Sequence, residues 1–178
     1  MTDTNTPAST PRKPPRRIAR EYALLGIYQS RIGGDDAIAI EAHLPDLAGL
    51  VDTFLEGRDN ENIAPLDPFD RADRTLCLRL LRGVLAQQPA LIEVLQPNLD
   101  RPFTELSPIE ASSLLLGAFE LTHSPEIPYR VVINECIELA KSFGGTDGHK
   151  FVNGVLDKLA GKLRPVEVEA RRAGNRPS

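Results

Sequence analysis

The sequence predicts an all-α fold, arranged either as one compact helical bundle or as two small bundles separated near the polar loop 57–65. Apolar residues recur at helical spacing through most of the chain, and no useful length of it alternates as a strand does. Helix start and stop signals separate these stretches. With 178 residues, 41% of them hydrophobic and 26% charged, the chain has an ordinary globular composition.

The N-terminal part begins with an extension that has little to bury. Residues 1–15 are rich in Thr, Pro and Ser and are predicted to be disordered. A helix follows from about 16 to 31, with Ile18, Tyr22 and Leu25 on its apolar face, and Gly33-Gly34 ends it. A weaker helical pattern covers 36–56 and is interrupted at Pro45, before the loop 57–65, which we expect to be mobile.

The middle of the chain is predicted to contain a strong helix. Asp67-Pro68 places a capping residue before a proline at the first helical position, so we expect the helix to begin there. Pro89 is expected to bend or break it, because an interior proline removes a backbone hydrogen bond. A shorter helix is predicted over 91–99.

The C-terminal part carries the clearest local signals. Ser107 and Glu110 form the pattern of a capping box, with Pro108 where no donor is needed, and predict a helix to about 122. A second helix is predicted from Pro128 to the stop at Gly144-Gly145, and a third over 147–162. The sequence thus predicts a folded region over 16–165, with bundles at about 16–88 and 89–165, and a flexible tail over 166–178.

Several classes of function find no support in the residues. No stretch is apolar enough to cross a membrane and no signal peptide is evident, so we expect a cytoplasmic protein. Cys77 and Cys136 fall in apolar helical patterns and are predicted core residues. The three histidines are scattered, and no phosphate-binding glycine pattern occurs, so we predict no metal, cofactor or catalytic residue. Glu120 lies in an apolar run, where a lone glutamate more often pairs locally or faces solvent.

A basic cluster at the start of the first helix is the main candidate for a binding site. The net charge is −4, yet residues 12–20 carry five basic side chains and no acidic one. Arg16, Arg17 and Arg20 lie on one face, although the first turn of a helix favours acids. Tyr28 projects from nearly the same side, and an aromatic ring beside guanidinium groups suits RNA bases and phosphates. Alternatively, Arg17 pairs with Glu21 and the rest is a solvated surface.

Two stretches of sequence carry a resemblance to a known family. The stretch RRIARE, from Arg16 to Glu21, followed by Ile27-Tyr28, resembles the start of NusB transcription antitermination factors. The stretch IPYRVVINECIELAKSFGGTDGHKFVNGVLDKLAGKLRP, residues 127–165, is similar to the C-terminal signature of that family almost throughout. The resemblance covers about 16–165 and implies a fold of about seven helices in two small bundles, without enzymatic activity.

The resemblance also implies partners and site residues. NusB proteins bind single-stranded boxA RNA of ribosomal RNA transcripts jointly with NusE, a small-subunit ribosomal protein, within the RNA polymerase antitermination complex. Neither DNA nor a membrane is expected as a partner. The implied RNA surface consists of Arg16, Arg17, Arg20, Tyr28, Phe143, Asp147, His149, Lys150 and Phe151. Glu110 is the candidate for the NusE contact.

The residues of the 143–151 segment have other possible roles. Phe143 and Phe151 flank a Gly-Gly turn and could stack on bases, but both also fit the apolar spacing of core residues. Asp147 could accept a hydrogen bond from a base edge or simply cap the last helix. Ile18 stands where many family members carry another arginine, which predicts weaker RNA binding or greater use of Arg12 and Lys13.

The sequence is also compatible with two other functions. The chain could be the NusB-like RNA-binding module of a ribosomal RNA cytosine methyltransferase, although such an enzyme needs an additional α/β cofactor domain. It could also be a helical protein-interaction or dimerisation factor without a role in RNA binding, which the acidic net charge allows.

Overall fold

The computed structural model describes residues 13–52 and 68–174, which are helical and contain no strand. The α-helices are α1 Pro15–Gly33, α2 Ala37–His43, α3 Ala48–Asp52, α4 Pro68–Arg71, α5 Arg74–Leu95, α6 Pro108–His123, α7 Tyr129–Phe143, α8 Gly148–Leu163 and α9 Pro165–Gly174. Three short 3-10 helices lie between them: η1 Leu44–Leu47, η2 Gln96–Asn98 and η3 Phe103–Glu105. The all-α prediction is confirmed.

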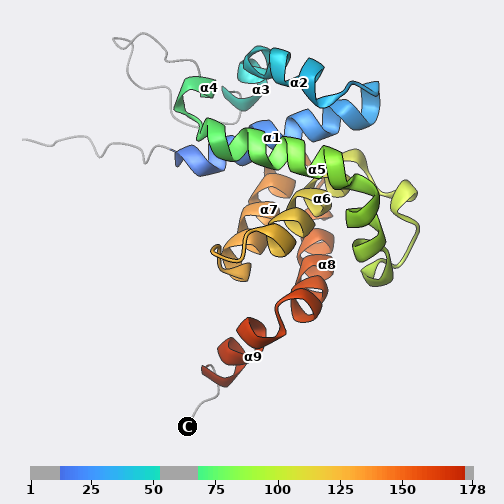
Figure 1. Cartoon of the computed structure of the whole chain (residues 1–178). Coiled ribbons are helices and arrows are strands. Elements are labelled where there is room, and N and C mark those ends of the chain that lie inside the picture. Colours follow the sequence, from blue (N-terminus) through green and yellow to red (C-terminus); the bar gives the residue numbers. More distant parts are fainter. Residues whose placement is uncertain (1–12, 53–67, 175–178) are drawn as a thin grey trace, which may run out of the picture.

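Helices α1 and α5 lie side by side and form the middle of the structure (Figure 1). Helices α2, α3 and α4 cover one side of this pair, whereas α6, α7 and α8 pack on the other. Helix α9 follows α8 at the far end from α2. Helix α1 contacts both α6 and α7.

Helix α1 is buried over most of its length, from Ile18 to Ile27. The lack of a side chain at Gly26 explains how α5 comes so close: a Cβ atom there would lie 2.9 Å from Cδ1 of Leu81. Gly34 ends the helix in the left-handed region, with φ 79°, and donates its amide to the carbonyl of Ser30. The predicted glycine stop is therefore confirmed.

The prediction for the start of the long central helix is wrong. Pro68 begins the short α4, and the long helix starts at Arg74, where Asp73 accepts a hydrogen bond from the amide of Leu76. By residue type both Asp67 and Asp73 suit a cap, so the local sequence does not distinguish them. Phe69 of the short α4 packs beside Tyr22, with ring centroids 4.9 Å apart. Pro89 does not break α5, which continues to Leu95 and changes direction in its second half (Figure 1).

The predicted capping box at Ser107 and the predicted helix end at Gly144 are confirmed. Ser107 accepts from the amide of Glu110, and the Glu110 carboxylate accepts from the amide of Ser107, which completes the capping box of α6. Gly144 ends α7, and a Cβ atom there would lie only 2.6 Å from the carbonyl oxygen of Ala140. A larger residue would therefore displace this turn.

The C-terminal tail differs from the prediction. Residues 166–174 are not a flexible tail: they belong to α9, whose Val168 is buried. The predicted boundary near residue 88 falls inside α5, and one buried cluster draws on helices before and after it, so the division into two bundles stays a prediction. The predicted disorder of 1–15 and the loop 57–65 lie wholly or largely outside the described residues. No described helix is long and apolar enough to span a bilayer.

Candidate nucleic-acid interface

Arg20 is buried in the contact between α1 and α6. Its guanidinium donates to both carboxylate oxygens of Glu120, at 2.9 and 2.8 Å, and the two side chains are 3% and 0% exposed. Burial lowers the pKa of Arg20, but the hydrogen bonds and charge of Glu120 outweigh it and leave the pKa raised. Arg20 therefore holds two helices together and is not available to RNA in this structure, contrary to the prediction.

Arg17 is also paired, but it is only half-buried. It donates through Nε and Nη2 to the two oxygens of Glu135 on α7, at 3.1 and 2.9 Å. These hydrogen bonds raise the pKa of Arg17. The alternative pairing of Arg17 with Glu21 is wrong. Glu21 instead forms an ion pair with Lys13, with 2.6 Å between Lys13 Nζ and Glu21 Oε1.

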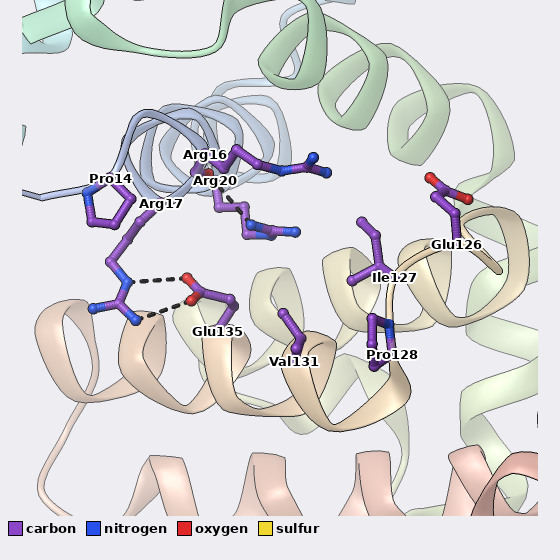
Figure 2. Close-up of a pocket in the computed structure, with 9 residues that line it drawn as sticks. All are labelled: Pro14, Arg16, Arg17, Arg20, Glu126, Ile127, Pro128, Val131 and Glu135. Atoms are coloured by element: carbon purple, nitrogen blue, oxygen red, sulfur yellow. Dashed lines mark hydrogen bonds and ion pairs between the residues drawn. The ribbon is translucent and has the colours of Figure 1, made fainter.

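Arg16 is the remaining arginine of the cluster. Its side chain is exposed, and it makes no hydrogen bond or ion pair within the described part of the chain. The arginine extends over an open groove of about 340 Å³ between the start of α1 and the turn that joins α6 to α7 (Figure 2). The groove is lined by Pro14, Arg16, Arg17, Arg20, Glu126, Ile127, Pro128, Val131 and Glu135. Among the described residues of the predicted basic cluster, Arg16 is the one whose charge is unpaired.

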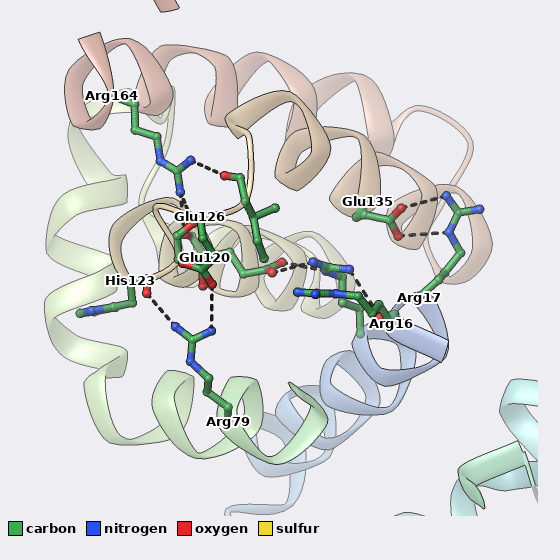
Figure 3. Close-up of polar contacts among 11 residues, drawn as sticks. Arg16, Arg17, Arg79, Glu120, His123, Glu126, Glu135 and Arg164 are labelled. Atoms are coloured by element: carbon green, nitrogen blue, oxygen red, sulfur yellow. Dashed lines mark hydrogen bonds and ion pairs between the residues drawn. The ribbon is translucent and has the colours of Figure 1, made fainter. Parts of the chain in front are cut away.

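The far wall of this groove is fixed by Arg164, at the end of α8 (Figure 3). The buried guanidinium donates to backbone carbonyls of the α6–α7 turn, and it also contacts Glu167 at 3.3 Å. The acceptors are the carbonyls of Glu120, Leu121, Ser124 and Ile127. Glu167 in turn accepts from the amide of Tyr129 at 2.8 Å, so residues close to the C-terminus shape the groove.

The second predicted part of the interface, residues 143–151, lies at the other end of α6. A Cβ atom at Gly148 would lie 3.2 Å from the carboxylate of Glu110, so the predicted NusE residue adjoins this segment. Asp147 and Lys150 are 78% and 73% exposed and form an ion pair of 3.2 Å. Asp147 makes no side-chain capping bond, although it stands at the start of α8, and His149 is half-buried.

The two phenylalanines of this segment contact the core, and stacking on bases stays a prediction for both. Phe143 and Phe151 are partly buried and pack against the core, so neither is a fully displayed ring. The guanidinium of Arg101 covers one face of Phe151, 4.6 Å from the ring centroid. Arg101 also approaches Glu110 at 3.9 Å. Sequence reasoning missed Arg101, because no local pattern links it to a ring fifty positions away.

Tyr28 lies between the two ends of the predicted surface. Helix α1 runs antiparallel to α6, because Arg20 meets Glu120 near the end of α6, whereas Arg31 lies over Phe103, just before α6 begins. Tyr28 is therefore nearer the 143–151 segment than Arg16 is. Glu110 and Glu120 are separated by about 15 Å along the axis of α6. The predicted residues thus form two areas rather than one continuous patch.

Nothing in the described residues resembles a metal centre: they contain no group of three or more His, Cys, Asp or Glu side chains suited to a metal ion. Cys77 and Cys136 are free and buried, as predicted, and burial raises the pKa of Cys77 to about 12. Glu120 neither faces solvent nor pairs within its own helix: both of its carboxylate oxygens accept hydrogen bonds from Arg20 on α1.

Comparison with known proteins identifies the family of this chain. A family model described as NusB family matches residues 17–161. The transcription antitermination protein NusB of Dechloromonas aromatica (strain RCB) is 51% identical over 162 residues, which cover 91% of this chain and 88% of that protein. The protein of the same name from Ralstonia nicotianae is 48% identical over 97% of this chain and 100% of its own.

Solved structures show the same fold. A structure of T. maritima NusB aligns with a TM-score of 0.60 and 25% identity, over 89% of this chain and 99% of that one. A crystal structure of the antitermination factors NusB and NusE in complex with dsRNA aligns with a TM-score of 0.61 and 19% identity, over 82% and 96% of the two chains. Since the family model and these relatives cover most of its length, the chain belongs to the NusB family.

Proposed function

We propose that this chain is a cytoplasmic transcription antitermination factor that binds boxA RNA of ribosomal RNA transcripts together with NusE. The observation that carries the proposal is the exposed, unpaired Arg16 over an open groove, in a chain that belongs to the NusB family. A free guanidinium on an otherwise paired surface is suited to an RNA phosphate. The protein acts by binding and assembly, without a catalytic residue or cofactor.

The arrangement of the predicted surface supports RNA as the ligand. The groove lies at one end of α6, and the exposed Lys150 and half-covered Phe151 lie at the other. One strand that contacted both areas would meet phosphate-binding cations and an aromatic ring, which is the combination that single-stranded RNA requires. Glu110 beside the second area offers a contact for NusE.

The curated relatives bear on the alternative functions. Both are named as antitermination proteins, and one of them is matched over 100% of its length. This favours antitermination over the role of a module in a cytosine methyltransferase. A helical interaction factor without RNA binding is the outcome that the following experiment would reveal.

The experiment is an RNA retardation assay with and without NusE. We expect the wild-type protein to bind boxA RNA more tightly than a scrambled RNA of the same length and composition, with the preference strongest when NusE is present. Equal binding of both RNAs in both conditions contradicts the proposal.

A second experiment tests whether Arg16 contacts an RNA phosphate, with Arg171 as the control position. Arg16→Ala should make the dependence of log Kd on log salt shallower by about 0.7, the value for one lost phosphate contact on a single strand. Arg171→Ala, at an exposed position in α9, should leave this slope unchanged. An equal slope for wild type and Arg16→Ala would place Arg16 off the RNA.

A further inference from the structure

The groove beside Arg16 is lined by apolar as well as charged side chains. The exposed Pro128 and Val131 contribute most of its apolar surface, and Ile127, which is 7% exposed, lies beside them (Figure 2). Val131 is 42% exposed, although it belongs to a helix whose opposite face is buried in the core. The groove thus sets an accessible apolar surface directly beside a free cation.

The charges around the groove are unevenly satisfied. Arg17 and Arg20 are neutralised by Glu135 and Glu120. Glu126 on the opposite wall is 62% exposed and approaches Arg79 at 3.7 Å. Arg16 is left as the lining residue whose charge has no partner in the described part of the chain.

The backbone adds to the positive potential on the Arg16 side. Helix α1 begins at the groove with Pro14 as its N-cap, without a side-chain cap and without an acid in its first turn. The positive end of the helix dipole therefore reinforces Arg16 instead of being cancelled. The amide of Tyr129 at the start of α7 is already taken by Glu167, so this second helix start contributes less.

We propose that this groove is a subsite for one unstacked nucleotide of the RNA, with the base against Ile127, Pro128 and Val131 and the phosphate on Arg16. An apolar floor next to a single cation matches the two chemically distinct parts of a nucleotide, a flat base and a charged phosphate. The subsite rests on the proposed function, since it assumes RNA as the ligand. It adds a base contact made by aliphatic residues of the α6–α7 turn and α7, none of which the sequence analysis placed in the RNA surface.

The test pairs a change in the protein with a change in the RNA. Val131→Asn replaces an exposed residue and should not disturb folding, which the urea midpoint checks. We expect it to weaken boxA RNA binding roughly five- to tenfold, because the base no longer buries an apolar side chain, without changing the salt slope. Val166→Asn, at a 79% exposed position in α9, is the matched control and should bind as wild type does.

The RNA is then varied by removing one base at a time. In wild type, one abasic position should cost about the same as Val131→Asn, and the two losses should not add when combined, because they remove the same contact. Additive losses, or a Val131→Asn variant with wild-type affinity, would overturn the subsite. Unchanged RNA affinity with weakened NusE binding would also overturn it and make the groove a protein surface.

These results separate the subsite from the proposed function. If wild type does not prefer boxA RNA over scrambled RNA, the function itself fails. If wild type shows the preference and Val131→Asn retains full affinity, only the subsite fails.

Discussion

Arg20 and Glu120 form a bidentate ion pair in the interior, with N–O distances of 2.8 and 2.9 Å across the contact between α1 and α6. The two residues are separated by 100 positions in the chain. The pair converts an arginine of the predicted RNA surface into a structural residue. It also accounts for Glu120, whose carboxylate is fully buried in an apolar helix.

Removing one partner of this pair should therefore destabilise the protein. Arg20→Met leaves the Glu120 carboxylate buried without a counter-charge, and we expect the free energy of unfolding to fall by about 3–5 kcal/mol. Urea denaturation measures the loss. The double variant Arg20→Met with Glu120→Met should lose much less than the sum of the single losses.

The exposed pair of Asp70 and Arg74 is the control. Asp70→Ala should lower stability by about 1 kcal/mol or less, because water screens an exposed ion pair. A loss as small as this in Arg20→Met would contradict the structural role of the buried pair.

Gly83 should tolerate no side chain, because α5 and α6 meet at this position. A Cβ atom there would lie 2.2 Å from Cζ of Phe119, inside the ring's van der Waals surface. We expect Gly83→Ala to destabilise the protein by about 1–3 kcal/mol as the ring is displaced. Thermal or urea unfolding measures this loss.

Gly154 in α8 provides the opposite case. It is exposed, and a Cβ atom there would meet nothing within 4 Å. Gly154→Ala should therefore raise stability by about 0.5–1 kcal/mol, through reduced freedom of the unfolded chain. Equal effects of the two substitutions would show that Phe119 does not pack on Gly83.

Glu21 should make a measurable contribution to the pH dependence of stability. Its side chain is 2% exposed, and burial raises the pKa of the carboxyl group above its ordinary value of 4.5, with Lys13 opposing the rise. A raised pKa in the folded state stabilises the protonated form. The contribution is present below about pH 4.5 and is lost as the pH rises through the folded-state pKa.

The variant Glu21→Gln isolates this effect. The free energy of unfolding of wild type minus that of Glu21→Gln should decrease from pH 4 toward neutrality, as measured by urea denaturation at each pH. An increase over the same range would mean that Lys13 dominates and that the pKa is lowered.

Arg164 should be required for the shape of the groove as well as for stability. Four backbone carbonyls accept from its guanidinium, and a lysine cannot reproduce that planar set of donors. We expect Arg164→Lys to cost about 2–4 kcal/mol, since several buried carbonyls lose their partner. Faster hydrogen exchange of the Ile127 amide would report the loosened turn.

Lys162 is the control for this prediction. It is an exposed cation in the last turn of α8, and Lys162→Ala should leave both stability and exchange at Ile127 nearly unchanged. Wild-type exchange in Arg164→Lys would show that the turn holds its shape without the guanidinium.

The sequence by itself determined the helical elements wherever a local signal marks their ends. The capping box at Ser107 and the glycine stop at Gly144 act within four residues of the chain, so their physics is contained in the local sequence. The start of α5 was mispredicted because Asp67 and Asp73 are both suitable caps. The local sequence does not distinguish them, and in the structure Asp73 caps α5 while the preceding α4 packs against α1.

The tertiary structure decided which arginines of the basic cluster are free. The local sequence offers Glu21 to Arg17, one turn away, but Arg17 reaches Glu135, 118 positions along the chain. Helix packing brings such carboxylates to α1, and spacing within α1 carries no information about them. As a result, the exposed Arg16 has no partner among the described residues, whereas Arg20 is buried against Glu120, a division that the run of arginines does not reveal.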